Sequence, residues 1–382
     1  MTPELSLYFH IPFCRRKCGY CSFISYTARE GQIRDYVEAL IIELRLTRRP
    51  GAVIRTIYIG GGTPSLLSAG DVERILDAVR QYYNVDSKVE ITLEANPGVV
   101  DEEYLRKLRQ EGVNRLSLGV QSLEDGELTF LGRLHTAADA RRTVDKAREA
   151  GFTNLSLDFI YGLPSRCLTD WDSMLDGIIA LGADHLSLYG LTLEPGTNLG
   201  EAAARGELPA VDPDRAASEY ELASARLSAA GYRNYEISNW TKVGFESRHN
   251  LVYWQRGEYL GLGVAAHSFT DERRIANTDS LDGYIGALAS GTLPKREIET
   301  VDEPGALSES IILALRLAEG VSLDDIGRQF KIDLWSRYAA EIGELSAFGL
   351  VEVSGERLRL TPKGRLLGNE VFLRFLPEKL MI

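Results

Sequence analysis

The sequence predicts an α/β fold: a barrel of six βα units that stays incomplete rather than a closed eight-stranded one. Two observations predict it. Short apolar runs alternate with stretches of helical periodicity through the first half of the chain, which is the pattern of a parallel sheet with covering helices. The 382 residues, 44% of them hydrophobic, are also enough to bury a large core.

Each unit is expected to consist of a short apolar strand followed by an amphipathic helix. The expected strands span residues 5–10, 55–60, 90–95, 115–120, 154–159 and 185–189, and the expected helices span residues 34–47, 69–83, 101–111, 137–150 and 169–181. In barrels built this way, catalytic and binding groups gather at the carboxyl ends of the strands. We therefore expect the functional site at that rim.

The pattern changes after residue 211, and we expect three units, at residues 1–211, 212–303 and 304–382. The second begins with a long helix over 212–230 and continues in an aromatic and glycine-rich stretch to residue 269. In the third, helical periodicity from residue 307, a Ser322-x-x-Asp325 capping signal, a helix over 334–348 and a hairpin over 350–360 predict a winged helix. Its ten Lys and Arg against eleven Asp and Glu provide no phosphate-binding face, so we expect a packing or lid role rather than DNA binding.

Composition narrows the class of partner. The formal net charge of −12 argues against nucleic acid and against an anionic membrane surface. No apolar run approaches the roughly 18 residues that cross a bilayer, and the first residues lack a basic segment followed by a hydrophobic stretch. We expect a cytoplasmic protein in a reducing compartment that acts on small molecules or other proteins.

Three of the four cysteines, Cys14, Cys18 and Cys21, form a C-x3-C-x2-C motif. Three thiolates from one tight loop suit a [4Fe–4S] cluster with one iron open to an outside ligand. Zinc is an alternative, with His10 as a fourth ligand, but no second cysteine pair follows. Disulfides are a weaker alternative, because three close cysteines cannot all pair. The fourth cysteine, Cys167, is expected to be a structural or incidental thiol.

Polar residues and glycines mark the ends of the predicted strands. Tyr8 and His10 close the first strand, and the later strand ends and the loop after the fourth strand supply Gly60, Gly61, Gly62, Thr63, Glu94, Gln121, Arg133 and Asp158. Glycines at a strand end let bare backbone approach a ligand closely. Taken singly, the carboxylates could equally cap helices or bond within loops. Because all of these residues are expected at the same rim of the barrel, together they indicate a ligand site.

The cysteine triplet followed by an aromatic residue, here Phe23, resembles the signature of the radical S-adenosylmethionine (SAM) enzymes. Over nearly the whole chain, the sequence is similar to the branch that holds oxygen-independent coproporphyrinogen III oxidase and the HemW haem chaperones. The resemblance implies an open three-quarter (β/α)6 barrel and a [4Fe–4S] cluster on the three cysteines. It also implies that an electron from the cluster splits SAM to a 5′-deoxyadenosyl radical, and that the thiolates are oxygen-sensitive. The matching SAM-contact positions are Tyr8, Gly60, Gly61, Gly62, Thr63, Glu94, Gln121, Arg133 and Asp158.

Two departures separate this chain from the oxidase. The oxidase has a further cysteine where Phe23 stands here, and an amino-terminal extension that helps to close its site, whereas Cys14 follows almost no extension. The positions through which the oxidase contacts a second SAM are partly retained, with Thr192 and His267 at two of them. These departures oppose tetrapyrrole decarboxylation, which stays the first alternative. A radical SAM enzyme acting on another substrate is the second.

A positive signal favours the chaperones. The run from His249 to Trp254 matches their H-N-x-x-Y-W motif, in which the histidine is implicated in haem binding. Imidazole is a common haem ligand and aromatic rings stack on a flat macrocycle. On chemistry alone, a histidine hydrogen-bonded within an aromatic cluster is the better interpretation, and the family match reverses that preference.

The resemblance as a whole implies a HemW-type chaperone that binds the cluster, SAM and haem b, the last through His249, and that transfers haem to apo-proteins. It implies a reductant such as flavodoxin or ferredoxin. It is compatible with binding SAM without converting coproporphyrinogen, and with conversion between monomer and homodimer.

Overall fold

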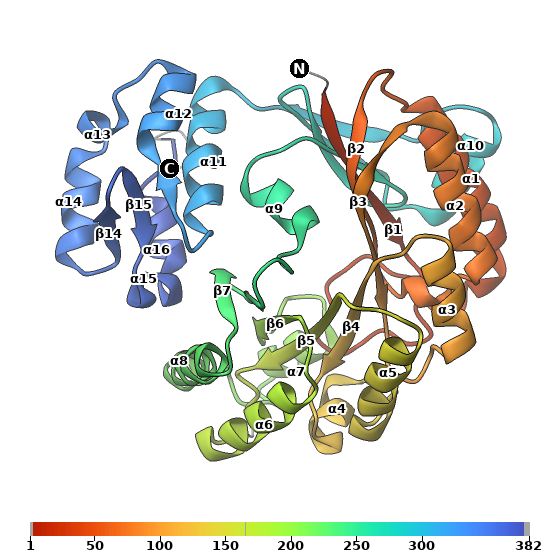
Figure 1. Cartoon of the computed structure of the whole chain (residues 1–382), viewed down its shortest axis with the longest axis horizontal. Helices are drawn as coiled ribbons and strands as arrows, with labels where there is room; N and C mark the ends of the chain where they lie inside the picture. Colours follow the sequence, from red (N-terminus) through yellow and green to blue (C-terminus); the bar gives the residue numbers. More distant parts are fainter. Residues whose placement is uncertain (1–2, 165, 378–382) are drawn as a thin grey trace.

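The computed structural model describes residues 3–164 and 166–377 and has a curved sheet covered on its outer face by helices (Figure 1). The expected strands are present as β1 (Glu4–Ile11), β2 (Val53–Gly61), β3 (Asn84–Ala95), β4 (Arg115–Gln121), β5 (Leu155–Tyr161) and β6 (His185–Gly190). The expected helices are present as α1 (Ile33–Leu46), α2 (Ala69–Tyr82), α3 (Glu102–Gln110), α5 (Ala137–Glu149) and α6 (Leu168–Ala180). A short helix α4 (Asp125–Leu131) after β4 was not predicted. None of the described helices is long and apolar enough to cross a membrane.

The sheet extends beyond the six predicted strands at both edges. Its twelve strands follow the order β12-β11-β10-β9-β1-β2-β3-β4-β5-β6-β8-β7, in which β1 to β6 are parallel neighbours. The added strands are β7 (Arg233–Glu236), β8 (Asn239–Thr241), β9 (Tyr259–Leu262), β10 (His267–Thr270), β11 (Arg273–Asn277) and β12 (Arg296–Thr300). Among the described strands no ladder joins β12 to β7, so the barrel stays open.

The outward face of the sheet packs against the helices in one apolar core. Alternate strand residues such as Leu7, Ile57 and Leu116 are buried there, as period-two alternation requires. Capping boxes start helices α2, through Ser68 with Asp71, and α5, through Thr136 with Asp139. Each such cap contributes about 1 kcal/mol.

The inward face of the barrel is polar. Its buried residues include Ser6, Thr56, Glu90, Thr92, Arg115, Ser117, Ser156 and His185. Buried polar groups are costly unless they are hydrogen-bonded. Some of these bond across neighbouring strands, as Thr56 does to Ser6 at 2.8 Å. Thr92 Oγ1 has no hydrogen-bond partner among the described residues. Helix α9 (Arg248–Trp254) lies between the sheet and the carboxy-terminal unit (Figure 1). The backbone N–H groups of Arg248 and His249 donate to the Glu90 carboxylate at 3.1 Å each.

The carboxy-terminal unit has the winged-helix order of elements. It comprises α11 (Glu303–Leu315), β13 (Val321–Ser322), α12 (Leu323–Phe330), α13 (Leu334–Arg337), α14 (Ala339–Ala347), β14 (Val351–Ser354), β15 (Arg357–Leu360), α15 (Pro362–Leu366) and α16 (Gly368–Leu373). Ser322 caps α12 as predicted, accepting from the Asp325 N–H at 3.2 Å. The single helix expected over 334–348 is wrong: it breaks at Tyr338, whose ψ of 21° leaves the helical range and whose ring packs on Phe375.

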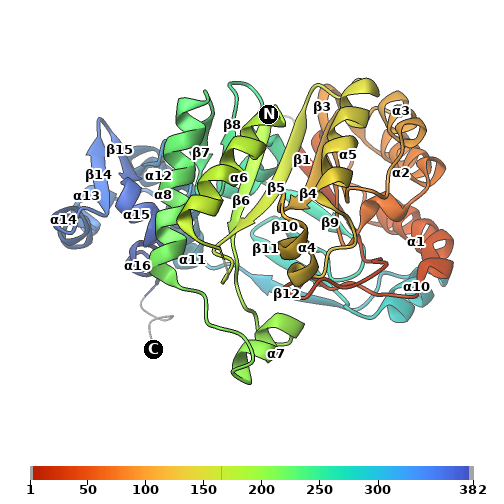
Figure 2. The same ribbon diagram turned by 90° about the horizontal axis from the view of Figure 1, so that it is seen from below.

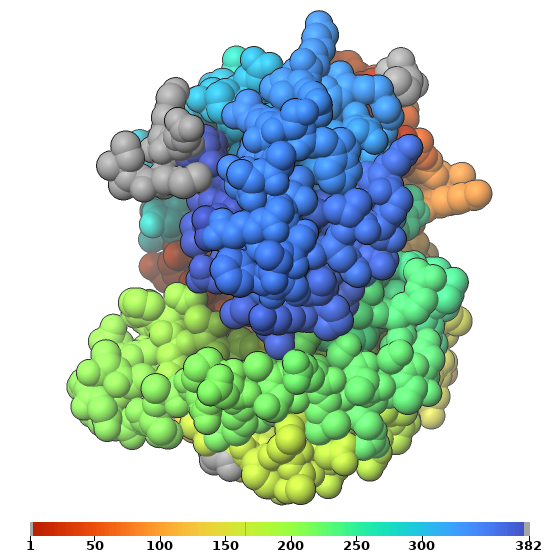
Figure 3. Space-filling model, turned by 90° about the vertical axis from the view of Figure 1, so that its left-hand side faces the viewer, coloured from red at the N-terminus to blue at the C-terminus, as the bar shows by residue number. Residues whose placement is uncertain are grey.

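This unit lies directly against the barrel. Figure 3 shows it beside the segment that contains α8 (Pro213–Ala229), the long helix that was predicted over 212–230. The Ala318 N–H donates to the Tyr235 carbonyl at 2.9 Å, and Arg365 donates to the Asn234 side chain. Two further helices, α7 (Asn198–Ala204) and α10 (Leu281–Ala289), lie at the barrel's carboxyl-end rim and beside α1 respectively.

Candidate functional site

A cavity of about 450 Å³ opens at the carboxyl ends of the parallel strands. Its volume is within the range typical of small-molecule sites. The structure brings ten predicted site residues to its wall: Cys14, Cys18, Cys21, Gly61, Gly62, Thr63, Glu94, Gln121, Arg133 and Asp158.

Backbone hydrogen bonds hold the cysteine loop at this rim. The Gly19 N–H donates to the Leu131 carbonyl at the end of α4 at 3.0 Å, and the Leu199 N–H of α7 donates to the Gly19 carbonyl at 2.8 Å. Figure 2 shows α4 and α7 on the same side of the molecule. Cys14 is buried, the other two cysteines are half-buried, and burial raises the pKa of the Cys21 thiol.

The end of β2 presents bare backbone beside this loop. A Cβ atom on Gly62 would lie 2.8 Å from the Phe13 carbonyl oxygen and 3.0 Å from the Cys14 Sγ atom. Gly61 has a φ of +111°, a conformation that favours glycine, and its N–H donates to the Glu94 carboxylate at 3.1 Å. Side chains at these positions would close the space between the strand end and the cysteines.

Arg133 ties two strand ends to the cysteine loop. Its Nη2 atom donates to the Asn96 Oδ1 atom at 2.5 Å and to the Gly119 carbonyl at 2.7 Å, and its Nη1 atom lies 3.4 Å from the Cys18 Sγ atom. Asn96 in turn donates to Thr63 Oγ1 at 3.2 Å. A fixed guanidinium beside a thiol favours the thiolate, which is the form that binds iron.

Two half-buried carboxyl groups form the opposite part of the wall. Burial raises the pKa of Glu94 to about 7, and its carboxylate accepts from the Tyr58 hydroxyl at 2.7 Å. Burial also raises the pKa of Asp158, opposed by hydrogen bonds from Ser187 and from Ser117, the latter at 3.3 Å. A cationic ligand would favour the ionised forms of both groups.

Several lining residues were not predicted: Tyr58, Asn96, Arg115, Ser117, Gly119, Ser187 and Tyr189. Three of them could have been predicted from the strand pattern, because alternate residues of a strand lie on the same face. Gly119, Ser117 and Arg115 share that face of β4 with Gln121. Arg115 is 2% exposed, and its Nε atom has no hydrogen-bond partner among the described residues. Gln121 has a φ of +69° next to a register shift in the ladder, a strained backbone of the kind found at ligand sites.

Two of the predicted SAM-contact residues, Tyr8 and Gly60, lie outside the cavity wall. The Tyr8 hydroxyl bonds to His10 Nδ1 at 3.1 Å, and His10 Nε2 bonds to the Ile24 carbonyl at 2.9 Å. Both ring nitrogens of His10 are thus already occupied. Gly60 lies behind Glu94, where a Cβ atom would come within 3.1 Å of that carboxyl group.

Of the positions compared above with the oxidase, Phe23 and Thr192 lie at the cavity mouth. Phe23 is 65% exposed and lines the mouth. Thr192 also lines it. His267 is exposed and is not among the lining residues.

His249 is buried in the barrel interior, outside the cavity wall. Its Nδ1 atom bonds to Thr56 Oγ1 at 2.7 Å, and its Nε2 atom bonds to the Tyr253 hydroxyl at 2.8 Å. The rings of Tyr58 and Tyr253 each lie 5.1 Å from the imidazole, and burial lowers the pKa of His249 to about 3. The imidazole is therefore neutral and has the arrangement that chemistry alone favoured, a histidine bonded within an aromatic cluster.

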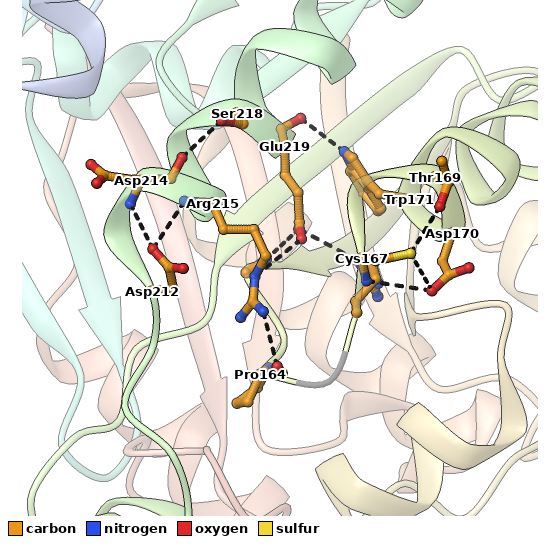
Figure 4. A network of polar contacts seen from close by, with 12 residues as sticks. Pro164, Cys167, Thr169, Asp170, Trp171, Asp212, Asp214, Arg215, Ser218 and Glu219 are labelled. Carbon is orange, nitrogen blue, oxygen red and sulfur yellow. Dashed lines mark hydrogen bonds and ion pairs between the residues drawn. The ribbon is translucent and has the colours of Figure 1, made fainter.

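Cys167 lies apart from the other cysteines. It precedes α6 and is exposed, with its Sγ atom 2.8 Å from Asp170 Oδ2. Figure 4 shows the neighbouring network, in which Glu219 of α8 accepts from the Trp171 indole through its carbonyl at 2.8 Å. The Glu219 carboxylate accepts from the Gly162 N–H at 2.7 Å, so this network fixes the loop that follows β5.

Three thiols of a C-x3-C-x2-C loop, bare glycine backbone and a strand-end cavity together define a radical SAM protein. The radical SAM superfamily matches residues 8–177, and the HemN C-terminal domain matches residues 301–367. Membership of the class implies a [4Fe–4S] cluster and SAM, and the site fits both: it has three thiols in one loop, and Gly61 and Gly62 leave the adjoining space clear. Within the described residues, no three His, Cys, Asp or Glu side chains are grouped closely enough to hold a single metal ion.

The relatives refine this assignment. The chain is 35% identical to the haem chaperone HemW of Bacillus subtilis over 98% of this chain and 99% of that one, and 38% identical to HemW of Mycobacterium tuberculosis over 96% and 93%. The structure of coproporphyrinogen III oxidase (HemN) from Escherichia coli, a radical SAM enzyme, superposes with a TM-score of 0.84 at 25% identity, covering 98% of this chain and 90% of that one. The chain belongs to the HemW family.

Proposed function

We propose that this protein binds haem and delivers it to apo-proteins in the cytoplasm, with a [4Fe–4S] cluster and SAM as resident cofactors. The observation that carries the proposal is the similarity over nearly the full length to proteins named haem chaperones, at 35–38% identity. The H-N-x-x-Y-W run at residues 249–254 adds to it.

Different residues of the cavity would bind the cluster and SAM. Cys14, Cys18 and Cys21 would hold the cluster. Arg133 would stabilise the cluster thiolates and attract the SAM carboxylate, since it is a half-buried cation whose Nη1 atom lies 3.4 Å from the Cys18 sulfur.

The remaining cavity residues would position SAM. The backbone from Gly61 to Thr63 would receive its amino group, and Glu94, Asp158 and Gln121 would hold its polar atoms, being the hydrogen-bonding groups that line the cavity. Once bound and reduced, the cluster supplies one electron for cleavage of SAM.

Haem binding through His249 requires a rearrangement of α9. In the described structure both imidazole nitrogens are hydrogen-bonded, so an iron atom would have to replace the Tyr253 hydroxyl at Nε2 or Thr56 at Nδ1. Helix α9 has two turns at most and bridges the barrel and the carboxy-terminal unit, so we propose that it moves to expose the histidine.

The alternative is the oxidase reaction, which the TM-score of 0.84 to HemN favours. Phe23 at the position of the oxidase cysteine opposes it. The two functions are separated by one experiment on the anaerobically reconstituted protein. Incubation with SAM, a strong reductant and coproporphyrinogen III is expected to give no doubly decarboxylated product by chromatography. Formation of protoporphyrinogen would establish the oxidase.

Haem delivery needs its own measurement. The protein is loaded with haem and mixed with either an apo-haemoprotein acceptor or apomyoglobin as a passive scavenger. Passive loss occurs at a rate independent of scavenger concentration, whereas delivery through a complex speeds up as the acceptor concentration rises. We expect the second behaviour with the acceptor. Failure to bind haem at micromolar concentration would reject the proposal.

A further inference from the structure

The loop between the first two cysteines carries three consecutive cations, Arg15, Arg16 and Lys17. All three are exposed, and none has a hydrogen bond or ion pair with any described residue. The chain as a whole has a net charge of −12, so the residues outside this run carry −15. An uncompensated charge of +3 therefore stands beside the cluster cysteines on an otherwise acidic protein.

Exposed apolar side chains adjoin these cations. Phe23 is 65% exposed and Leu134 is 64% exposed. Arg16 and Lys17 share the wall of the main cavity with Phe23, and Arg16 also lines a smaller cavity of about 40 Å³ with Leu134. We call Arg15, Arg16, Lys17, Phe23 and Leu134 the cysteine-loop face.

The position of this face points to a partner outside the cavity. Within the cavity the half-buried guanidinium of Arg133 is available for the anionic groups of a small ligand. The three loop cations point to solvent, and the one exposed carboxylate among the described residues that line the mouth is that of Glu194. A basic surface with apolar side chains on an acidic protein attracts an acidic protein to that surface and repels it elsewhere.

We propose that the cysteine-loop face is the docking surface for an acidic one-electron carrier protein that reduces the cluster. This inference rests on the proposed function, because it presupposes a cluster at Cys14, Cys18 and Cys21. The carrier gives up one electron and the cluster accepts it, so no other reactant is needed. Docking on the loop that holds the cluster gives the electron its shortest path through the protein.

The test is stopped-flow reduction of the reconstituted cluster under anaerobic conditions with two reductants. Flavodoxin hydroquinone is an acidic carrier protein, and reduced methyl viologen is a small cation. In the variant Arg16→Glu/Lys17→Glu we expect the second-order rate with flavodoxin to fall at least about 10-fold and to lose its decrease with salt. The rate with methyl viologen is expected to stay the same or rise.

The matched control is Arg45→Glu/Arg48→Glu. These arginines are exposed near the end of α1, and their side chains have no hydrogen bond or ion pair with a described residue. Because α1 runs back antiparallel to the strands, they lie at the opposite rim of the barrel. The control is expected to keep the wild-type rates. A similar loss of rate there would overturn the proposal, since net charge alone would explain it.

Other outcomes are equally decisive. An unchanged flavodoxin rate in the loop variant with a full iron content would overturn the proposal, as would a loss of haem affinity without a loss of electron transfer, which would assign these cations to haem carboxylates. If charge reversal prevents cluster assembly, Arg16→Gln/Lys17→Gln keeps the chain lengths similar and is judged in the same way. Absence of a reducible cluster in the wild type would instead reject the proposed function.

Discussion

The Nη1 atom of Arg133 lies 3.4 Å from the Sγ atom of Cys18, and no other guanidinium among the described residues bonds to a cysteine of the triplet. A charge-assisted hydrogen bond to a thiolate lowers the energy of the anionic form. Through Asn96 and Gly119, Arg133 links the end of β3 and the end of β4 to the cysteine loop. It is therefore the residue through which the barrel would act electrostatically on a cluster.

Replacing Arg133 by Gln is expected to lower the reduction potential of the cluster, because a positive charge beside a thiolate is lost. It is also expected to weaken SAM binding by roughly 10- to 100-fold, the cost of a hydrogen bond to a charged group. Spectroscopic redox titration and a SAM binding titration measure the two effects. Arg133→Lys keeps the charge but loses the forked geometry, so the reduction potential of the cluster should change less in this variant. Equal reduction potentials in the wild type and Arg133→Gln would contradict the electrostatic role of Arg133.

Replacing Cys18 by Ala is expected to abolish the visible absorbance and the iron content of the protein after anaerobic reconstitution. The same result is expected for Cys14→Ala and Cys21→Ala, since all three thiols line one cavity. Cys167→Ala is the matched control, because Cys167 is exposed and lies outside that cavity. A full cluster in Cys18→Ala would remove this cysteine from the site.

Replacing Gly62 by Ala is expected to lower the yield of reconstituted cluster at least about 2-fold and to destabilise the apoprotein by roughly 1–3 kcal/mol, the cost of overpacking. The added methyl group would lie 2.8 Å from the Phe13 carbonyl and 3.0 Å from the Cys14 Sγ atom. In Gly31→Ala the methyl group would meet nothing within 4 Å, which makes it a matched control. Iron content and thermal unfolding distinguish the two variants; identical behaviour would show that the β2 end has room for a side chain.

Glu94 makes the stability of the apoprotein depend on pH. Burial raises its pKa from 4.5 to about 7, so the folded form holds the proton more tightly than the unfolded form. The stabilisation is complete below pH 4.5 and is lost as the pH rises through 7. Over that range the contribution of this group falls by roughly 3–4 kcal/mol, since each pKa unit is worth about 1.4 kcal/mol.

The variant Glu94→Gln is expected to flatten this dependence in denaturant unfolding at a series of pH values. Glu236, whose pKa burial also raises to about 7, lies outside the cavity wall and contributes a similar slope. Glu236→Gln should therefore flatten the curve equally while leaving SAM binding intact. A wild-type slope in Glu94→Gln would mean that Glu94 ionises normally.

Replacing His249 by Ala is expected to destabilise the protein by roughly 2–4 kcal/mol, because it empties a buried position and removes the hydrogen-bond partner of the Tyr253 hydroxyl, while Thr56 keeps only its bond to Ser6. It should also weaken haem binding in a titration followed by the absorbance of bound haem. Tyr253→Phe removes the hydroxyl that occupies Nε2 and should raise haem affinity. If neither variant changes the haem titration, His249 is a structural residue of the barrel interior and the haem ligand lies elsewhere.

Local patterns determined the barrel and the cluster loop. The strands β1 to β6 and their helices follow from periodicity over a few neighbouring residues, and the three cysteines lie within eight residues of one another. Such features need no knowledge of the distant chain. The ten predicted residues that meet in the cavity follow from one rule, that the carboxyl ends of parallel strands share a rim.

Contacts between distant segments decided the rest. The strand β9 pairs with β1 although some 250 residues separate them. A strand of four residues is too short for its sequence pattern to predict that pairing. The environment of His249 is likewise non-local, since its partner Thr56 lies 193 residues away. The sequence by itself determined which candidate residues gather at the strand-end rim. The tertiary structure decided that His249 is enclosed and that Arg115 faces the cavity, because burial and hydrogen bonding depend on which strands become neighbours.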